Sequence, residues 1–200
     1  SRLENYHEKI AVINDLSGLG KCSLTAAIPV ISVMGVQACP LPTAVLSNQT
    51  GYESYFCEDF TEHMEPYMEQ WKKKRIFSQM GIYTGFLSDD KQADRILKFM
   101  DAFAGKDTLI LTDPVMGDDG RGLSDLYRRT PQPVLRTDTS FLCDHTDLTE
   151  ALLLLYGKEK MEEIWNKLQK VSEARRMEEI REIGCRLARK FSLPAVVITG

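Results

Sequence analysis

The sequence lacks paired cysteines: its five cysteines are scattered along the chain and form no C-x-x-C pair. Disulfide frameworks use even sets of cysteines, and structural zinc sites use closely spaced ones. The pattern therefore excludes a disulfide-stapled secreted fold and a cysteine-based zinc site. We interpret all five as reduced thiols of a cytoplasmic protein: Cys22, Cys39, Cys57, Cys143 and Cys185.

Long apolar runs and an excess of basic residues are also missing. No apolar run approaches the roughly 20 residues that a membrane-spanning helix needs. The first residues, Ser1–Glu8, are too polar for a signal peptide. The formal net charge is −4, so no basic surface is expected to contact nucleic-acid phosphates. We expect a globular protein with neither a membrane nor a nucleic-acid partner.

What is present favours an α/β fold. The 200 residues are 43% hydrophobic and 27% charged, which is ordinary for a protein with a sizeable core. Their length suits a single domain, 1–200. Apolar runs alternate with amphipathic stretches, which predicts a mostly parallel open sheet with helices on both faces. The predicted strands are Lys9–Ile13, Val36–Pro40, Met80–Thr84, Leu109–Thr112 and Ala195–Thr199. The predicted helices are Leu24–Met34, Phe60–Lys74, Lys91–Ala104, Thr149–Tyr156 and Lys158–Lys190.

One acidic stretch, Leu109–Gly120, carries the first functional signal. A short apolar strand ends at Asp113, and Pro114 stops the ladder because it has no N–H to donate. Open α/β sheets bind ligands beyond the carboxyl ends of their strands, and crowded carboxylates need solvent or a cation to neutralise them. Two hypotheses follow: Asp113 helps to place a magnesium–nucleotide, or it lies in a solvated acidic turn that caps a helix.

Three further segments combine turn residues with polar or aromatic groups. Asn14–Lys21 predicts a turn between strand and helix, with Ser23 as the N-cap. It lacks the full G-x-x-x-x-G-K-[ST] spacing of a phosphate-binding loop, so a tight turn of small residues fits equally. Asn48–Tyr52 has groups that can bind a small polar heterocycle, or it forms the tip of a hairpin. Phe86 either covers a ligand ring at a strand end or packs in the core.

Five stretches follow one another in a recognisable order between Ile10 and Gly200. They read IAVINDLSGLGKCSLTAAIPVISVMGVQACPLPTAVLSNQTGYESY, GIYTGFLSD, DPVMGD, LTEALLL and AVVITG. In these stretches the chain resembles the pyridoxal/pyridoxamine kinase branch of the ribokinase-like superfamily. The resemblance implies a ribokinase-like fold, a homodimer, and phosphoryl transfer from MgATP to the 5′-hydroxymethyl group of pyridoxal, pyridoxamine or pyridoxine. Such transfer depends mainly on positioning and charge neutralisation.

The resemblance also implies roles for six residues that match the motifs of that family. The residues expected to face the vitamer are Asp15, Thr50 and Phe86. The residues expected to approach ATP are Asp113, Glu150 and Thr199, with Asp113 and Glu150 near Mg²⁺. Carboxylates of this kind suit Mg²⁺.

Three departures from the family pattern stand out. The T-P-N-x-x-E motif has lost its proline and has Asp147 in place of asparagine, which predicts either repulsion of ATP or a second cation. Arg121–Cys143 has no helical period and is predicted to be a loop. The G-T-G-D motif, which implies the anion hole and the catalytic base, is absent from the 200 residues. We therefore expect a chain without the C-terminal part of the fold, and we identify no catalytic residue.

Two alternatives to a vitamin B6 kinase remain open. One is a hydroxymethylpyrimidine kinase of the same fold, which would differ in the ring that the segment around Asp15 and Thr50 accepts. The other is a non-catalytic module that binds the vitamer, or a partner, without turnover. The absent G-T-G-D motif favours this module for the chain as written.

Overall fold

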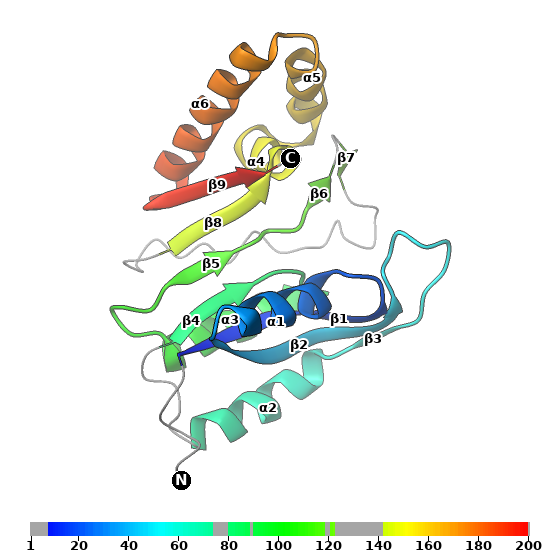
Figure 1. Ribbon diagram of the computed structural model, residues 1–200, viewed down its shortest axis with the longest axis vertical. Helices are drawn as coiled ribbons and strands as arrows, with labels where there is room; N and C mark the ends of the chain where they lie inside the picture. The colour runs from blue at the N-terminus through cyan, green and yellow to red at the C-terminus, as the bar shows by residue number, and fades with distance from the viewer. Residues whose placement is uncertain (1–7, 74–79, 89, 119–120, 123–141, 200) are drawn as a thin grey trace. The chain divides into compact units, whose positions relative to one another are not determined.

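A computed structural model of the chain describes residues 8–73, 80–88, 90–118, 121–122 and 142–199. The chain divides into two compact units, Ser1–Leu111 and Thr112–Gly200. Each unit combines strands with helices (Figure 1). The prediction of a mostly parallel α/β fold is confirmed, and the prediction that 1–200 is a single domain stays a prediction. Among the described helices, none is both long enough and apolar enough to cross a membrane.

The first unit is built on strands in the order β3-β2-β1-β4-β5. Strand β1 (Lys9–Leu19) pairs in parallel with β2 (Gln37–Asn48) and β4 (Met80–Thr84), and β2 pairs antiparallel with β3 (Cys57–Asp59). Strand β5 (Ile110–Thr112) follows β4 in this order. Strands β2 and β3 lie on one side of β1, and β4 and β5 lie on the other side. The sheet therefore has a topological switch point between β1 and β4.

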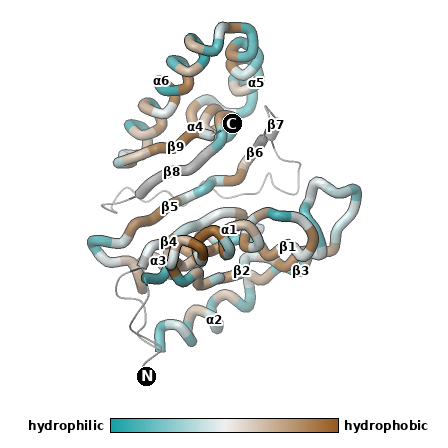
Figure 2. The backbone as a smooth tube through the Cα atoms, viewed as in Figure 1, coloured by the Kyte–Doolittle hydropathy of each residue, from teal (hydrophilic) through white to brown (hydrophobic). Residues whose placement is uncertain are grey.

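Three helices accompany these strands: α1 (Ser23–Val33), α2 (Thr61–Lys73) and α3 (Asp90–Phe103). Right-handed crossovers place α1 and α3 on opposite faces of the sheet. Helix α1 has no charged residue and is coloured as hydrophobic along most of its length (Figure 2). Helices α2 and α3 pack through aromatic rings, and the Trp71 and Phe99 centroids lie 6.0 Å apart. The predicted strand Met80–Thr84 is confirmed, and the helices agree with their predicted ranges to within about one residue.

The prediction of a turn at Asn14–Lys21 is wrong. Strand β1 continues to Leu19, because the backbone beyond Ile13 still pairs with β2, where Leu16 lies opposite Val45 and Leu19 opposite Asn48. The turn begins only at Gly20. The prediction of Ser23 as N-cap is also wrong: Cys22 is the N-cap, and its N–H donates to Thr25 Oγ1 at 3.3 Å.

The second unit contains a hairpin, a parallel strand pair and three helices. The hairpin is β6 (Gly117–Asp118) and β7 (Arg121–Gly122), and the pair is β8 (Leu142–Asp147) with β9 (Ala195–Thr199). The helices are α4 (Leu148–Tyr156), α5 (Lys158–Leu168) and α6 (Glu173–Phe191). Their apolar faces form one cluster with a fully buried centre: Ala151, Leu152, Met161 and Leu187.

Two predictions in this unit need correction. The single helix predicted over Lys158–Lys190 is wrong: the chain breaks after Leu168 and restarts at Glu173, so two helices form a hairpin. The loop predicted over Arg121–Cys143 is wrong at its ends, which belong to β7 and β8. Residues 123–141 lie outside the described part of the chain.

Candidate functional site

The first candidate site lies where β1 and β4 diverge, at the switch point of the sheet. The pairing of β1 with β4 ends at Ile13 opposite Thr84. Asn14 comes next on β1, and its Oδ1 accepts hydrogen bonds from the N–H of Asp15 at 3.0 Å and of Phe86 at 2.9 Å. Ligands of open α/β sheets bind at such a point. The structure therefore brings two of the predicted vitamer residues, Asp15 and Phe86, to one shared anchor.

The backbone of Gly85 lies in close contact with the side chain of Asn14. A Cβ built on Gly85 would lie 2.2 Å from Asn14 Nδ2 and 2.8 Å from Asn14 Oδ1. No side chain tolerates such distances, so the residue between β4 and Phe86 has to be glycine while Asn14 keeps its place. The sequence signal for Asn14 was a polar residue directly after an apolar strand, but the residue was assigned to a turn.

Asp15 is buried, with 6% of its surface exposed. The Ser17 hydroxyl donates to Asp15 Oδ2 at 2.9 Å, which orients the carboxylate. Opposite Asp15 the register between β1 and β2 shifts: β1 advances from Asn14 to Leu16 while β2 advances from Pro42 to Val45. Such irregularities re-aim side chains and are frequent beside active sites.

Thr43 of β2 is fully buried and lies in the stretch where the register shifts. The Thr43 hydroxyl donates to the carbonyl oxygen of Phe86 at 2.8 Å. The backbone of Phe86 is thus held on both sides, by Asn14 at its N–H and by Thr43 at its carbonyl. Sequence reasoning missed Thr43, because no local pattern predicts a shift in strand register.

Thr50, the third predicted vitamer residue, is not part of this contact set. It is exposed in the turn after β2, where the N–H of Gln49 donates to the carbonyl of Leu19 at 2.8 Å. The Thr50 hydroxyl makes no hydrogen bond with the residues that the structure describes. Its role in binding the vitamer remains a prediction.

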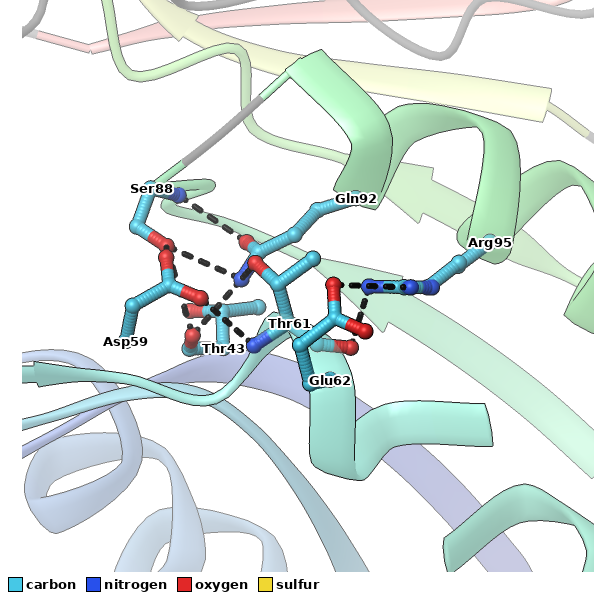
Figure 3. A network of polar contacts seen from close by, with 7 residues as sticks. All are labelled: Thr43, Asp59, Thr61, Glu62, Ser88, Gln92 and Arg95. Atoms are coloured by element: carbon cyan, nitrogen blue, oxygen red, sulfur yellow. Dashed lines mark hydrogen bonds and ion pairs between the residues drawn. The ribbon is translucent and has the colours of Figure 1, made fainter. Parts of the chain in front are cut away.

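Asp59, at the end of β3, belongs to a polar network that includes Ser88, two residues after Phe86 (Figure 3). It accepts hydrogen bonds from the Ser88 hydroxyl and, at 2.7 Å, from the N–H of Thr61. Partial burial raises the pKa of Asp59, but these hydrogen bonds and the charge of Arg95 more than offset it, so the pKa lies below its ordinary value. Arg95 in turn donates to the carbonyl of Thr61 and pairs with Glu62 at 3.3 Å.

The second candidate site belongs to the other unit and is the loop after β5. Val115 has a φ of 40°, a strained value for a β-branched residue that persists only where neighbours hold the chain. Its N–H lies 3.4 Å from Asp113 Oδ1. The N–H of Met116 donates to Glu150 Oε1 at 2.7 Å. Asp113 and Glu150 are therefore joined through one short, tightly held loop.

Glu150 also fixes the start of α4. Its Oε2 accepts from the N–H of Asp147 at 3.1 Å, and Asp147 Oδ1 accepts from the N–H of Glu150 at 2.7 Å. This reciprocal pair is a capping box. Asp147, the departure from the expected asparagine, is thus the N-cap of α4, a position where Asp and Asn serve equally well.

Thr199 lies at the carboxyl end of β9, where it is exposed and directly opposite Asp147 in the β8–β9 pair. The three residues predicted to approach ATP all belong to the second unit: Asp113, Glu150 and Thr199. No group of three or more His, Cys, Asp or Glu side chains with metal-binding geometry occurs among the residues of the described ranges. The metal role of Asp113 and Glu150 stays a prediction.

Four of the cysteines are free thiols: Cys22, Cys39, Cys57 and Cys185. The side chain of Cys143 lies outside the described part of the structure. The redox state predicted for the cysteines stays a prediction.

Comparison with known proteins identifies the fold. Searches found no matching family model and no matching curated protein. A crystal structure of a candidate phosphomethylpyrimidine kinase from Bacteroides thetaiotaomicron, in a form with pyridoxal, is 35% identical over 97% of this chain, with a TM-score of 0.77. The chain has the ribokinase-like fold.

Other relatives of this ribokinase-like chain share the fold at lower identity. Pyridoxal kinase from Leishmania donovani in complex with ADP and pyridoxamine is 20% identical over 96% of the chain, with a TM-score of 0.70. Pyridoxal kinase from Entamoeba histolytica is 15% identical over 97% of the chain, with a TM-score of 0.71. The chain spans 62–64% of the length of these three relatives.

Proposed function

We propose that this chain carries the substrate sites of a kinase that transfers the γ-phosphoryl group of MgATP to the 5′-hydroxymethyl group of pyridoxal, pyridoxamine or pyridoxine. The observation that carries the proposal is the 35% identity, over 97% of the chain, to a protein crystallised with pyridoxal. The anchored polar site at the switch point of the sheet is where such a ring would bind.

In this proposal Asp15 and Phe86 form the vitamer site, and Thr50 closes it. Ser17 holds one oxygen of the Asp15 carboxylate, and the other accepts no hydrogen bond from the described residues, so it can accept one from a polar substituent of the ring. Phe86, with its backbone held at both ends, offers a fixed aromatic surface for stacking.

The MgATP substrate is assigned to Asp113, Glu150 and Thr199. Carboxylates fit Mg²⁺, which keeps several of its waters when it binds protein and phosphate. Each Glu150 oxygen already accepts a backbone N–H, so Glu150 suits a contact to Mg²⁺ through water. Bound Mg²⁺ would neutralise charge on the phosphates during transfer. We assign no catalytic base, and we retain the expectation of a cytoplasmic homodimer.

A second candidate function has one observation in its favour. The relative from Bacteroides thetaiotaomicron carries the name of a candidate phosphomethylpyrimidine kinase. A hydroxymethylpyrimidine ring would then replace the pyridine ring at the same site.

The test measures binding and turnover on the same sample. Calorimetry with pyridoxine, hydroxymethylpyrimidine and MgATP gives each affinity separately, and ADP release reports turnover. Pyridoxine is the better B6 probe because it has no aldehyde to form imines with lysine amines. We expect pyridoxine to bind and hydroxymethylpyrimidine to bind at least about tenfold more weakly, a difference of about 1.4 kcal/mol. The reverse order would support the second candidate, and binding without ADP release would support the non-catalytic module.

A matched pair of variants locates the site. Asp15→Asn removes the charge of the buried carboxylate, whereas Asp107→Asn removes an exposed charge in the same unit. We expect Asp15→Asn alone to weaken pyridoxine binding, with MgATP binding unchanged in both variants. Equal pyridoxine affinity in both would remove Asp15 from the vitamer site.

A further inference from the structure

Gln92, in the first turn of α3, is an uncharged polar residue with 0% of its surface exposed. It is followed at helical spacing by two fully buried apolar residues, Ile96 and Phe99. A purely structural core would take an apolar side chain at this position. A buried amide is retained only where its hydrogen bonds are satisfied, so its partners indicate what it does.

The partners of Gln92 come from three separate segments (Figure 3). Its Oε1 accepts from the N–H of Ser88 at 2.9 Å. Its Nε2 donates to the carbonyl of Thr43 at 2.7 Å and lies 2.9 Å from the hydroxyls of Thr61 and Ser88. A backbone N–H can only donate and a carbonyl can only accept, so these partners fix the orientation of the amide.

Two of these partners flank Phe86. The hydroxyl of Thr43 donates to the Phe86 carbonyl, and Ser88 ends the short turn that contains Phe86. The Gln92 amide hydrogen-bonds to the carbonyl of Thr43 and to the N–H of Ser88 at the same time. The turn is thereby fixed to β2 on one side and to α3 on the other, while Asn14 holds the Phe86 N–H from β1.

We propose that Gln92 is a positioning residue for the vitamer ring: by holding Thr43 and Ser88 together, it sets where the aromatic side chain of Phe86 lies beside the substrate. This role rests on the proposed function, because Phe86 is assigned to the vitamer site there. The placement of the turn does not rest on it and can be measured without any ligand.

The test uses two Gln92 variants and a matched control. Gln92→Met keeps an unbranched side chain of similar length but removes every hydrogen bond of the amide. Gln92→Glu keeps the acceptor for Ser88 and removes the donor to Thr43, so it serves if the Met variant does not fold. The control is Thr108→Val, which removes a buried hydroxyl beyond the other end of α3, where it accepts from the N–H of Gly105 at 2.8 Å.

Three quantities are measured: hydrogen exchange of the Phe86 amide, the dissociation constant of pyridoxine and the dissociation constant of MgATP. We expect the Gln92 variants to speed Phe86 exchange about tenfold, because the opening of the turn costs less. We expect them to raise the pyridoxine dissociation constant roughly fivefold, the size of one net hydrogen bond. The MgATP dissociation constant should not change in the Gln92 variants. Thr108→Val should match the parent in Phe86 exchange and in both dissociation constants, even if its melting temperature falls as far as that of the Gln92 variants.

The outcomes separate the inference from the proposed function. Phe86 exchange that is equal in the Gln92 variants and in Thr108→Val would overturn the inference. So would faster exchange with an unchanged pyridoxine dissociation constant, because the placement of Phe86 would then not matter to the ring. If the parent chain binds no pyridoxine, while hydrogen exchange of the Phe86 amide is still faster in the Gln92 variants, the proposed function fails. The role of Gln92 toward the vitamer then fails with it.

Discussion

Replacing Glu150 by glutamine is predicted to destabilise the second unit although the two side chains have nearly the same shape. The Glu150 carboxylate is 5% exposed and accepts two backbone hydrogen bonds, from Met116 at 2.7 Å and from Asp147 at 3.1 Å. A glutamine has one acceptor oxygen, and its NH₂ group only donates. In Glu150→Gln, one of the two backbone N–H groups therefore faces another donor.

The size of the effect follows from these contacts. A hydrogen bond to a charged group contributes about 1.5–3 kcal/mol to stability. A buried donor left without an acceptor costs about 1–3 kcal/mol. We expect the free energy of unfolding to fall by about 2–3 kcal/mol, which corresponds to a melting temperature lower by about 5–10 °C for a chain of this size. The strained φ at Val115 is predicted to relax in the variant, because Met116 is no longer held.

The assay is urea unfolding followed by tryptophan fluorescence. The chain has two tryptophans, Trp71 in the first unit and Trp165 in the second, so a Trp71→Phe background reports the second unit alone. Glu162→Gln is the control, because it removes an exposed charge from α5 and should change stability by less than about 0.5 kcal/mol. If Glu150→Gln unfolds within about 0.5 kcal/mol of the same background, the carboxylate does not hold the two segments together.

Three further predictions concern single contacts. Gly85→Ala should destabilise by about 1–3 kcal/mol because its Cβ would meet Asn14 at 2.2 Å, whereas Gly105→Ala, with its nearest atom at 3.9 Å, should be nearly neutral in the same thermal unfolding assay; equal losses would contradict the close approach. Asp147→Asn should leave the free energy of urea unfolding within about 0.5 kcal/mol, because both residues cap helices, and a loss above about 1 kcal/mol would mean that the charge itself matters. The pKa of Asp59 is lowered in the fold, so its carboxylate stabilises the protein above about pH 4 and that contribution is lost as the pH falls through the folded-state pKa. Asp59→Asn should therefore lose less stability than the parent between about pH 4 and pH 2, and parallel pH profiles would show that the contribution is absent.

The strands that are short, apolar and bounded by turns could be predicted from the sequence. Met80–Thr84 and Ala195–Thr199 were predicted at their observed bounds, because a short run of apolar and β-branched residues between turns favours a strand. Strand β1 was predicted too short, since its second half is polar and glycine-containing. Only pairing with β2, a contact between residues distant in the sequence, keeps this segment extended.

For the candidate sites, the sequence predicts the residues assigned to ligands but not the residues that support them. Phe86 and Asp113 stand just after strand ends, where an α/β pattern itself predicts ligands, and Asp15 follows the apolar half of β1. The residues that hold them in place could not be predicted. Thr43 acts through a shift of strand register, and Gln92 acts through three segments that meet only in the folded chain. In the sequence, the one signal for Gln92 is a polar residue on the apolar face of a predicted helix.

The most direct test of the central claim is the calorimetric titration of pyridoxine into the parent chain and into Phe86→Ala. The account predicts saturable binding of one pyridoxine per chain, and an affinity at least about tenfold weaker in the variant, a loss of about 1.4 kcal/mol. MgATP should bind both proteins equally, because its assigned residues lie in the second unit. Pyridoxine binding that is unaffected by the loss of Phe86, or binding of hydroxymethylpyrimidine in preference to pyridoxine, would contradict the account.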